Sequence, residues 1–131
     1  MDVEALLAAA RGALEDAYVP YSEYRVGAAL LTEDGETYVG CNVENANYSN
    51  SLHAEEVAVA EAVKRGHREF AALAVASSEQ DGVTPCGMCR QTLAEFCEES
   101  LPVYCDEGES VSKYRLGELI PNTIQPATLG K

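Results

Sequence analysis

The chain has 131 residues and carries 22 acidic against 9 basic residues, a net charge of −13. This length predicts a single domain over residues 1–131. A chain this acidic repels the phosphate backbone of DNA and RNA. We therefore expect no nucleic-acid partner. The longest apolar runs, such as residues 26–31, are far too short to cross a bilayer, so we expect no membrane partner either.

The charge pattern also bears on where the protein works. The N-terminus begins Met1-Asp2-Val3-Glu4, which is acidic where a secretory signal would be basic, so we expect a cytoplasmic protein. The acids are spread along the whole chain, and only three residues are lysines (Lys64, Lys113 and Lys131). This distribution favours a protein from a high-salt cytoplasm over an ordinary acidic one.

The N-terminal half predicts one helix followed by a hairpin. Apolar residues recur at helical spacing over residues 2–17, and Pro20 cannot continue that helix. Residues 25–32 and 37–42 predict two strands joined by a turn, because Asp34-Gly35 is a hairpin signal. The segment 44–51, rich in asparagine and serine, predicts an irregular loop.

The C-terminal half alternates between helices and strands. Residues 53–65 predict a helix that stops at Gly66, and residues 70–77 predict a central strand buried on both faces, because they are apolar throughout. The remaining predicted elements are a helix over 86–98, short strands over 102–105 and 111–114, and a helical turn over 116–120. This order predicts an α/β fold with three α-β-α layers around a mixed sheet of about five strands.

Two short stretches carry the chemistry, Ser51-Leu52-His53-Ala54-Glu55 and Pro85-Cys86-Gly87-Met88-Cys89-Arg90-Gln91. His53, Cys86 and Cys89 offer one imidazole and two thiols, a set that suits Zn²⁺ and leaves the fourth tetrahedral position open, as in catalytic sites. Glu55 is not needed as a ligand, so it is free to handle protons beside a metal-bound water. Both stretches are expected at helix N-termini, whose partial positive charge favours thiolates.

Two other interpretations of Cys86 and Cys89 stay open. Cys86 and Cys89 alone would also suit a redox pair, and Cys41, Cys97 or Cys105 would be needed to close a structural zinc site. Otherwise we expect those three to be buried small hydrophobic residues. An odd number of cysteines, five, argues against a disulfide framework. We expect His67 to be a solvated turn residue.

The pairing of His-Ala-Glu with Pro-Cys-x-x-Cys is the signature of zinc-dependent nucleobase deaminases. Further motifs extend from residue 3 to 121, and the sequence resembles the short, homotetrameric type of the cytidine deaminase family. These motifs are residues 20–22 (PYS), 26–30 (VGAAL), 40–46 (GCNVENA) and 118–121 (ELIP). The resemblance implies hydrolytic deamination of cytidine or deoxycytidine in pyrimidine salvage, with Zn²⁺ as cofactor and Glu55 as proton shuttle.

The resemblance also implies how a pyrimidine nucleoside binds. Asn42 and Glu44 would hold the ribose 3′-hydroxyl, since an amide and a carboxylate offer it a donor and an acceptor. Tyr24 would pack on the pyrimidine, where the family usually has phenylalanine. The backbone amide of Ala54 would orient the base.

Three more residues have roles implied by the resemblance. Ala46 and Tyr48 would lie in a loop that reaches the active site of a neighbouring subunit in a homotetramer. Arg90 would hydrogen-bond the sulfur of a cysteine ligand.

The sequence departs from the family pattern at the first ligand. Members of this size commonly have cysteine where His53 stands and arginine where Glu56 stands. With one imidazole and two thiolates the ligand charges cancel that of Zn²⁺, so the need for an arginine falls. Alternatively, Glu56 is only a first-turn helix residue, favourable near the N-terminus. A further departure is Ile124, where many relatives have a phenylalanine that closes a neighbour's pocket.

Two other functions compete with this one. The first is deamination of a related substrate, namely a nucleotide, a base in a polynucleotide or an aminopyrimidine antibiotic. A nucleotide would need cations near the sugar site, and none lies beside Asn42 or Glu44 in the sequence. The second is a non-enzymatic module stabilised by zinc, which Glu55 and the open ligand position disfavour.

Overall fold

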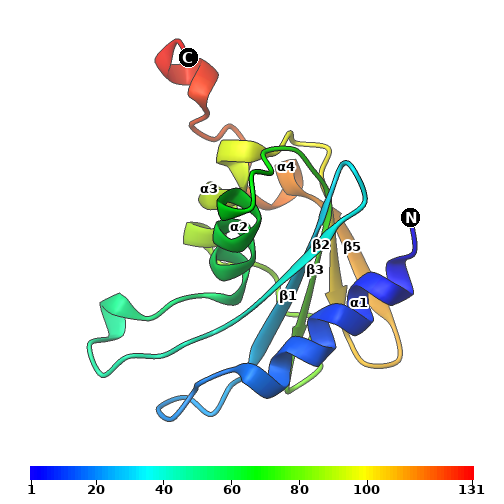
Figure 1. Ribbon diagram of the computed structural model, residues 1–131, viewed down its shortest axis with the longest axis vertical. Helices are drawn as coiled ribbons and strands as arrows, with labels where there is room; N and C mark the ends of the chain where they lie inside the picture. The colour runs from blue at the N-terminus through cyan, green and yellow to red at the C-terminus, as the bar shows by residue number, and fades with distance from the viewer.

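A five-stranded mixed sheet forms the centre of the protein (Figure 1). The computed structural model describes all 131 residues. The strands lie in the order β2-β1-β3-β4-β5; β3 and β4 are parallel, and the other three neighbouring pairs are antiparallel. Their bounds are Val26–Thr32 (β1), Thr37–Cys41 (β2), Phe70–Ser77 (β3), Pro102–Asp106 (β4) and Val111–Arg115 (β5).

Helices cover both faces of this sheet, as Figure 1 shows. The helix α1 (Val3–Gly12) covers one face, whereas α2 (Ala54–Lys64) and α3 (Gly87–Phe96) cover the other. The predicted three-layer α/β fold is therefore confirmed. Four short elements complete the chain: η1 (Ala13–Asp16), η2 (Tyr48–Asn50), α4 (Leu116–Leu119) and η3 (Pro126–Leu129). None of the helices combines the length and the hydropathy needed to cross a membrane.

Side-chain alternation along the strands builds a separate core on each face. Leu73 and Val75 of β3 face α2 and α3, whereas Ala72 and Ala74 face α1. This explains why the strand is apolar throughout, because both of its faces are buried. The face toward α1 is lined mostly by alanine, which leaves that helix room to lie close to the sheet.

The start of α2 packs closely against β2 because residue 40 is glycine. A Cβ atom at Gly40 would lie 2.2 Å from the carbonyl oxygen of Ala54. No side chain fits at that distance, so the missing Cβ permits the contact between strand and helix. The contact fixes the first turn of α2, which carries Glu55 and directly follows His53.

A buried ion pair joins α1 to the end of β4. Asp106 is 1% exposed, and its carboxylate accepts hydrogen bonds from Nε (3.0 Å) and Nη2 (2.8 Å) of Arg11. The Arg11 guanidinium holds the pKa of Asp106 below its ordinary value of 3.8. The stabilisation from this pair is therefore complete above that value and is lost as the pH falls through the lower pKa of the folded state.

The spare cysteines and His67 need separate comment. Cys97 and Cys105 are buried, as predicted, whereas Cys41 is half-buried. The prediction for His67 was wrong: its side chain is only 18% exposed and its Nε2 lies 3.0 Å from a carboxylate oxygen of Glu36. The ring of His67 also packs against Tyr38, with 5.3 Å between centroids. The hairpin between β1 and β2 folds over this histidine, a tertiary contact that the local sequence does not show.

Candidate active site

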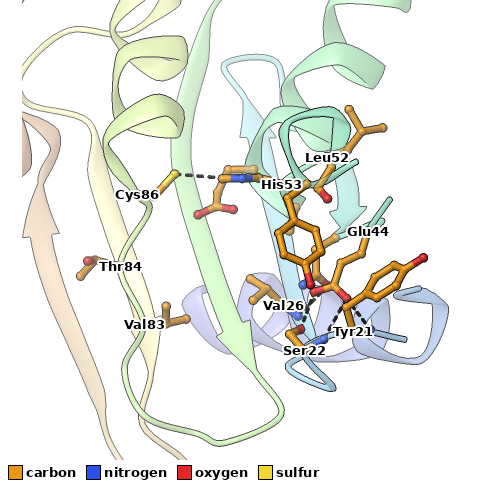
Figure 2. Close-up of a pocket in the computed structure, with 14 residues that line it drawn as sticks. Tyr21, Ser22, Val26, Glu44, Leu52, His53, Val83, Thr84 and Cys86 are labelled. Atoms are coloured by element: carbon orange, nitrogen blue, oxygen red, sulfur yellow. Dashed lines mark hydrogen bonds between the residues drawn. The ribbon is translucent and has the colours of Figure 1, made fainter. Parts of the chain in front are cut away.

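Two helix N-termini bring the predicted ligands together. His53 precedes the first residue of α2, and Cys86 precedes the first residue of α3. The Nδ1 atom of His53 lies 3.1 Å from the Cys86 sulfur and 3.5 Å from the Cys89 sulfur (Figure 2 marks the first of these). Cys41, Cys97 and Cys105 take no part in this group, so none of them supplies a fourth ligand.

The spacing of these donor atoms fits a zinc ion. Zinc bonds of about 2.3 Å to sulfur and 2.0–2.1 Å to nitrogen place tetrahedral N and S ligands roughly 3.6 Å apart. The three donor atoms lie within 4.8 Å of one another, so a small adjustment completes the geometry. Burial raises the pKa of the Cys89 thiol, and a bound cation would reverse this preference by stabilising the thiolate.

Glu55 lies beside the ligands as a largely buried residue. It is 5% exposed, forms no hydrogen bond with the side chain of another residue, and lines the cavity next to His53. Burial raises its pKa above the ordinary value. A carboxyl group with a raised pKa and a free path into a cavity is suited to accepting and returning protons.

Glu56 fixes the backbone of the first ligand. Its Oε1 accepts a hydrogen bond of 2.6 Å from the backbone amide of His53, so the pair forms a capping box at the start of α2. Glu56 is thus more than a solvated first-turn residue, since it orders the turn that carries His53 and Glu55.

A cavity of about 440 Å³ opens in front of these residues, within the range for small-molecule sites. Its lining includes His53, Glu55 and Cys86 together with Asn42, Glu44 and Tyr48. Figure 2 shows Cys86 and Glu44 on opposite sides of the pocket. Its lining holds two carboxylates and no lysine or arginine.

Known proteins resemble this chain in sequence. The sequence profile of the cytidine and deoxycytidylate deaminase zinc-binding region matches residues 1–105. The chain belongs to the cytidine and deoxycytidylate deaminase family. It is 56% identical over 130 residues to a cytidine deaminase of Sporosarcina psychrophila, covering 98% of this chain and 96% of that protein. It is 41% identical over 125 residues to a cytidine deaminase of Halalkalibacterium halodurans, covering 95% of each.

A solved structure agrees with the sequence comparison. The crystal structure of cytidine deaminase from Burkholderia pseudomallei superposes with a TM-score of 0.90 and 42% identity, covering 95% of this chain and all of that one. The deaminase fold is therefore established, and the three side chains that could hold a metal ion lie within the stretch that matches the family's zinc-binding region.

The deaminase places Asn42 and Glu44 at the cavity, but both side chains already hold the turn over residues 20–24. The Asn42 amide donates to the Tyr24 carbonyl (2.8 Å) and accepts from the Val26 amide (2.9 Å). The Glu44 carboxylate accepts from the backbone amides of Tyr21 (3.0 Å) and Ser22 (3.1 Å) and from the Ser22 hydroxyl. The Ser22 hydroxyl is the largest cause of the lowered pKa of Glu44.

Two predicted substrate contacts lie elsewhere. Tyr24 is not part of the cavity lining, and its hydroxyl donates to Oδ2 of Asp81 at 2.7 Å. Burial raises the pKa of Tyr24, as expected for a phenol tied into the structure. Ala46 is exposed and lies outside the lining, whereas the buried Ala54 belongs to it.

Arg90 bonds oxygen atoms rather than sulfur. Its guanidinium donates to the carbonyls of Pro85 (2.6 Å) and Leu119 (2.6 Å) and to the Thr84 hydroxyl (2.9 Å). The structure shows no hydrogen bond from Arg90 to a cysteine ligand, and three of the five N–H groups of its guanidinium donate to these oxygen atoms. Arg90 instead fastens the loop before Cys86 to the end of α4.

Several cavity residues were not predicted as site residues. Thr84 and Val83 form one wall, while Tyr21 and Ser22 form part of the opposite one (Figure 2). Ser22 carried a signal, since it belongs to the Pro-Tyr-Ser motif that supported the resemblance. For Val83 and Thr84 the only signal in the sequence was their position just before Pro85-Cys86.

Proposed function

We propose that this protein, as a single catalytic domain, hydrolyses cytidine and deoxycytidine to uridine and deoxyuridine with release of ammonia. The observation that carries the proposal is the largely buried Glu55 beside three side chains that could hold zinc, in the lining of a cavity large enough for a nucleoside. The cytidine deaminases that resemble this chain support the choice of substrate. Pyrimidine salvage in the cytoplasm is the corresponding cellular role.

The chain's own residues then share the work. His53, Cys86 and Cys89 would hold the zinc ion, which would make a bound water acidic enough to ionise near neutral pH. Glu55 accepts the proton of the water that adds to C4 of the cytosine ring. It returns protons to N3 and to the departing amine, so water is consumed and ammonia leaves. The Ala54 backbone amide orients the base from the first turn of α2.

The outer end of the cavity has hydrogen-bonding capacity left for a sugar. The Asn42 Nδ2 group has two N–H bonds and uses one, on the Tyr24 carbonyl. Oε2 of Glu44 accepts one hydrogen bond, from Ser22, and therefore keeps a free acceptor position. A ribose 3′-hydroxyl that accepts from Asn42 and donates to Glu44 uses both.

The charge of the cavity favours nucleosides over nucleotides. Its lining contains Glu44 and Glu55 but no cationic side chain to bind a phosphate. A phosphate near Glu44 would meet like charge, which is unfavourable in a partly enclosed site. The net charge of −13 disfavours polynucleotides for the same reason.

A panel of cytosine, cytidine, deoxycytidine, dCMP and adenosine tests this function directly. The zinc-loaded protein is expected to deaminate cytidine and deoxycytidine and to leave the other three almost untouched. A preference for dCMP would contradict the nucleoside assignment. A zinc-loaded protein that deaminates nothing would favour the non-enzymatic module.

Replacement of Asn42 or Glu44 by alanine is expected to lower kcat/KM for cytidine by about 10- to 100-fold, because a buried hydroxyl loses a partner. Steady-state kinetics measure the loss, and zinc content should stay at that of the parent. Since both side chains also hold the turn over residues 20–24, thermal unfolding of each variant separates lost binding from lost structure. A variant with parental kcat/KM would remove its residue from the ribose site.

We also propose that the protein is a homotetramer in which Ala46 and Tyr48 approach a neighbouring subunit. The mouth of the cavity supports this, because Tyr48 is 73% exposed and Leu52 is 47% exposed. The rings of Tyr21 and Tyr48 already meet there, with 5.9 Å between centroids. Apolar side chains gathered around a site mouth are typical of an interaction surface.

Light scattering is expected to give a tetramer at high salt and a looser assembly at low salt, because a strongly acidic surface repels itself when unscreened. Deamination should fall together with the tetramer. Full activity in a species that scatters as a monomer would contradict shared active sites.

A further inference from the structure

We propose that Ser22 is a positioning residue for the substrate: its hydroxyl holds the Glu44 carboxylate in the orientation that leaves one acceptor position free for the ribose 3′-hydroxyl. This inference rests on the proposed function, and it adds a residue and a specificity role that the sequence did not assign.

The Glu44 carboxylate is held at both oxygen atoms by one turn of the chain. Oε1 accepts the backbone amides of Tyr21 (3.0 Å) and Ser22 (3.1 Å), and Oε2 accepts the Ser22 hydroxyl (Figure 2). The two backbone bonds converge on Oε1 alone and cannot fix the plane of the carboxylate. The hydroxyl on Oε2 supplies the second point that fixes this plane.

The direction of the Ser22 hydroxyl is set by its other neighbour. The backbone amide of Tyr24 donates to Ser22 Oγ at 3.0 Å, so the hydroxyl proton is directed at Glu44. Serine has one proton to donate, and here it occupies one acceptor position of Oε2. Any further hydrogen bond to Oε2 must use its remaining acceptor position, and both Glu44 and Ser22 line the cavity.

The turn that carries Ser22 is anchored to the strand segment that carries Asn42 and Glu44. The Tyr18 amide donates to the Asn42 carbonyl (3.0 Å), and the Glu44 amide donates to the Tyr18 carbonyl (2.8 Å). Glu23, next to Ser22, has a φ of +57°, and its amide donates to the Val19 carbonyl (3.0 Å). A left-handed residue within a hydrogen-bonded turn indicates that tertiary contacts hold the turn in one conformation.

The same hydroxyl keeps Glu44 in the form that can accept. Together with the two backbone amides it lowers the pKa of this carboxyl. An ionised carboxylate accepts the ribose hydroxyl, whereas a protonated one would compete as a donor.

The test compares cytidine with 3′-deoxycytidine, which lacks the hydroxyl in question, using the zinc-loaded protein. Ser22→Ala is expected to lower kcat/KM for cytidine by about fivefold, mostly through KM, and to leave 3′-deoxycytidine unchanged. Ser22→Thr keeps the hydroxyl and should restore most of the preference. Ser112→Ala is the matched control. Ser112 lies on the remote strand β5, and its hydroxyl makes the same kind of bond to the carboxylate of Glu107.

The outcomes separate this inference from the proposed function. If the parent distinguishes the two substrates and Ser22→Ala distinguishes them equally well, the role of Ser22 is overturned and the ribose contacts stand. An equal loss on both substrates also overturns it, since it reports a general loosening of the site. If the parent itself does not distinguish them, the ribose contacts fail, and the role of Ser22 with them.

Discussion

Replacing Glu55 with glutamine is expected to lower kcat at least about 100-fold, the low end of the range for general acid–base catalysis, while one zinc ion per chain stays bound. Glutamine keeps the size of the side chain but can neither accept nor return a proton at neutral pH. Zinc is expected to remain because His53, Cys86 and Cys89 supply the ligands and Glu55 supplies none. Metal analysis and steady-state kinetics on the same preparation measure both quantities.

The burial of Glu55 is also the reason why we expect the fold to tolerate the change to glutamine. The Glu55 side chain is only 5% exposed and burial raises its pKa, so the folded protein bears a desolvation cost for the charged form that the neutral amide avoids. We therefore expect the variant to unfold at a temperature no lower than that of the parent. Near-parental turnover in a zinc-replete variant would remove Glu55 from the mechanism.

The second large effect is expected at the first ligand. His53→Cys should keep zinc but lose about tenfold or more in kcat, because a third thiolate brings the charge of the zinc and its ligands from zero to −1. The added negative charge raises the pKa of the bound water, so less of it is ionised at neutral pH. Zinc content, the pH dependence of kcat and the deamination rate together report the change.

Adding Glu56→Arg to His53→Cys places a compensating charge beside the site and is expected to recover part of the lost rate. The structure also predicts that this double variant is less stable than the parent. Glu56 accepts the backbone amide of residue 53 at 2.6 Å, and arginine cannot accept a hydrogen bond. The double variant should thus lose about 1 kcal/mol of stability even as its rate improves.

Glu56→Gln is the control for that cost, because glutamine retains the capping acceptor without the charge. A double-mutant cycle on the deamination rate decides whether residues 53 and 56 compensate for each other. Strict additivity of the two changes would refute compensation and leave Glu56 with its capping role alone.

The fold was largely readable from local pattern. The strand over 70–77 and the turn at Asp34-Gly35 appear where the sequence predicts them, because a continuous apolar run and a turn dipeptide are local signals. The predicted helix over 2–17 ends earlier as a regular α-helix, at Gly12, and continues as the tighter η1. Arg25 lies against this end and donates to the carbonyls of Leu14 and Ala17, a contact from outside the helix that no periodicity reveals.

In the site, too, local sequence patterns were predictive and distant contacts were not. His53, Glu55, Cys86 and Cys89 were readable because each pair lies within one helical turn and has a spacing tied to its chemistry. The hydrogen-bond partners of Tyr24 and Arg90 could not be predicted from the sequence, because they depend on loops that meet only in the folded protein. Tyr24 bonds Asp81, 57 positions away, and Arg90 bonds Leu119, 29 positions away. A residue type implied by family resemblance carries no information about such distant acceptors.

For protein engineering, the close contact between β2 and α2 divides the active-site region into a fixed part and a variable part. At position 40 any side chain would enter the space of the Ala54 carbonyl and push away the turn that carries both a metal ligand and the proton carrier. Libraries meant to change substrate preference should therefore leave position 40 as glycine. Diversity belongs at Tyr48, which is exposed and lines the cavity from a loop outside α2.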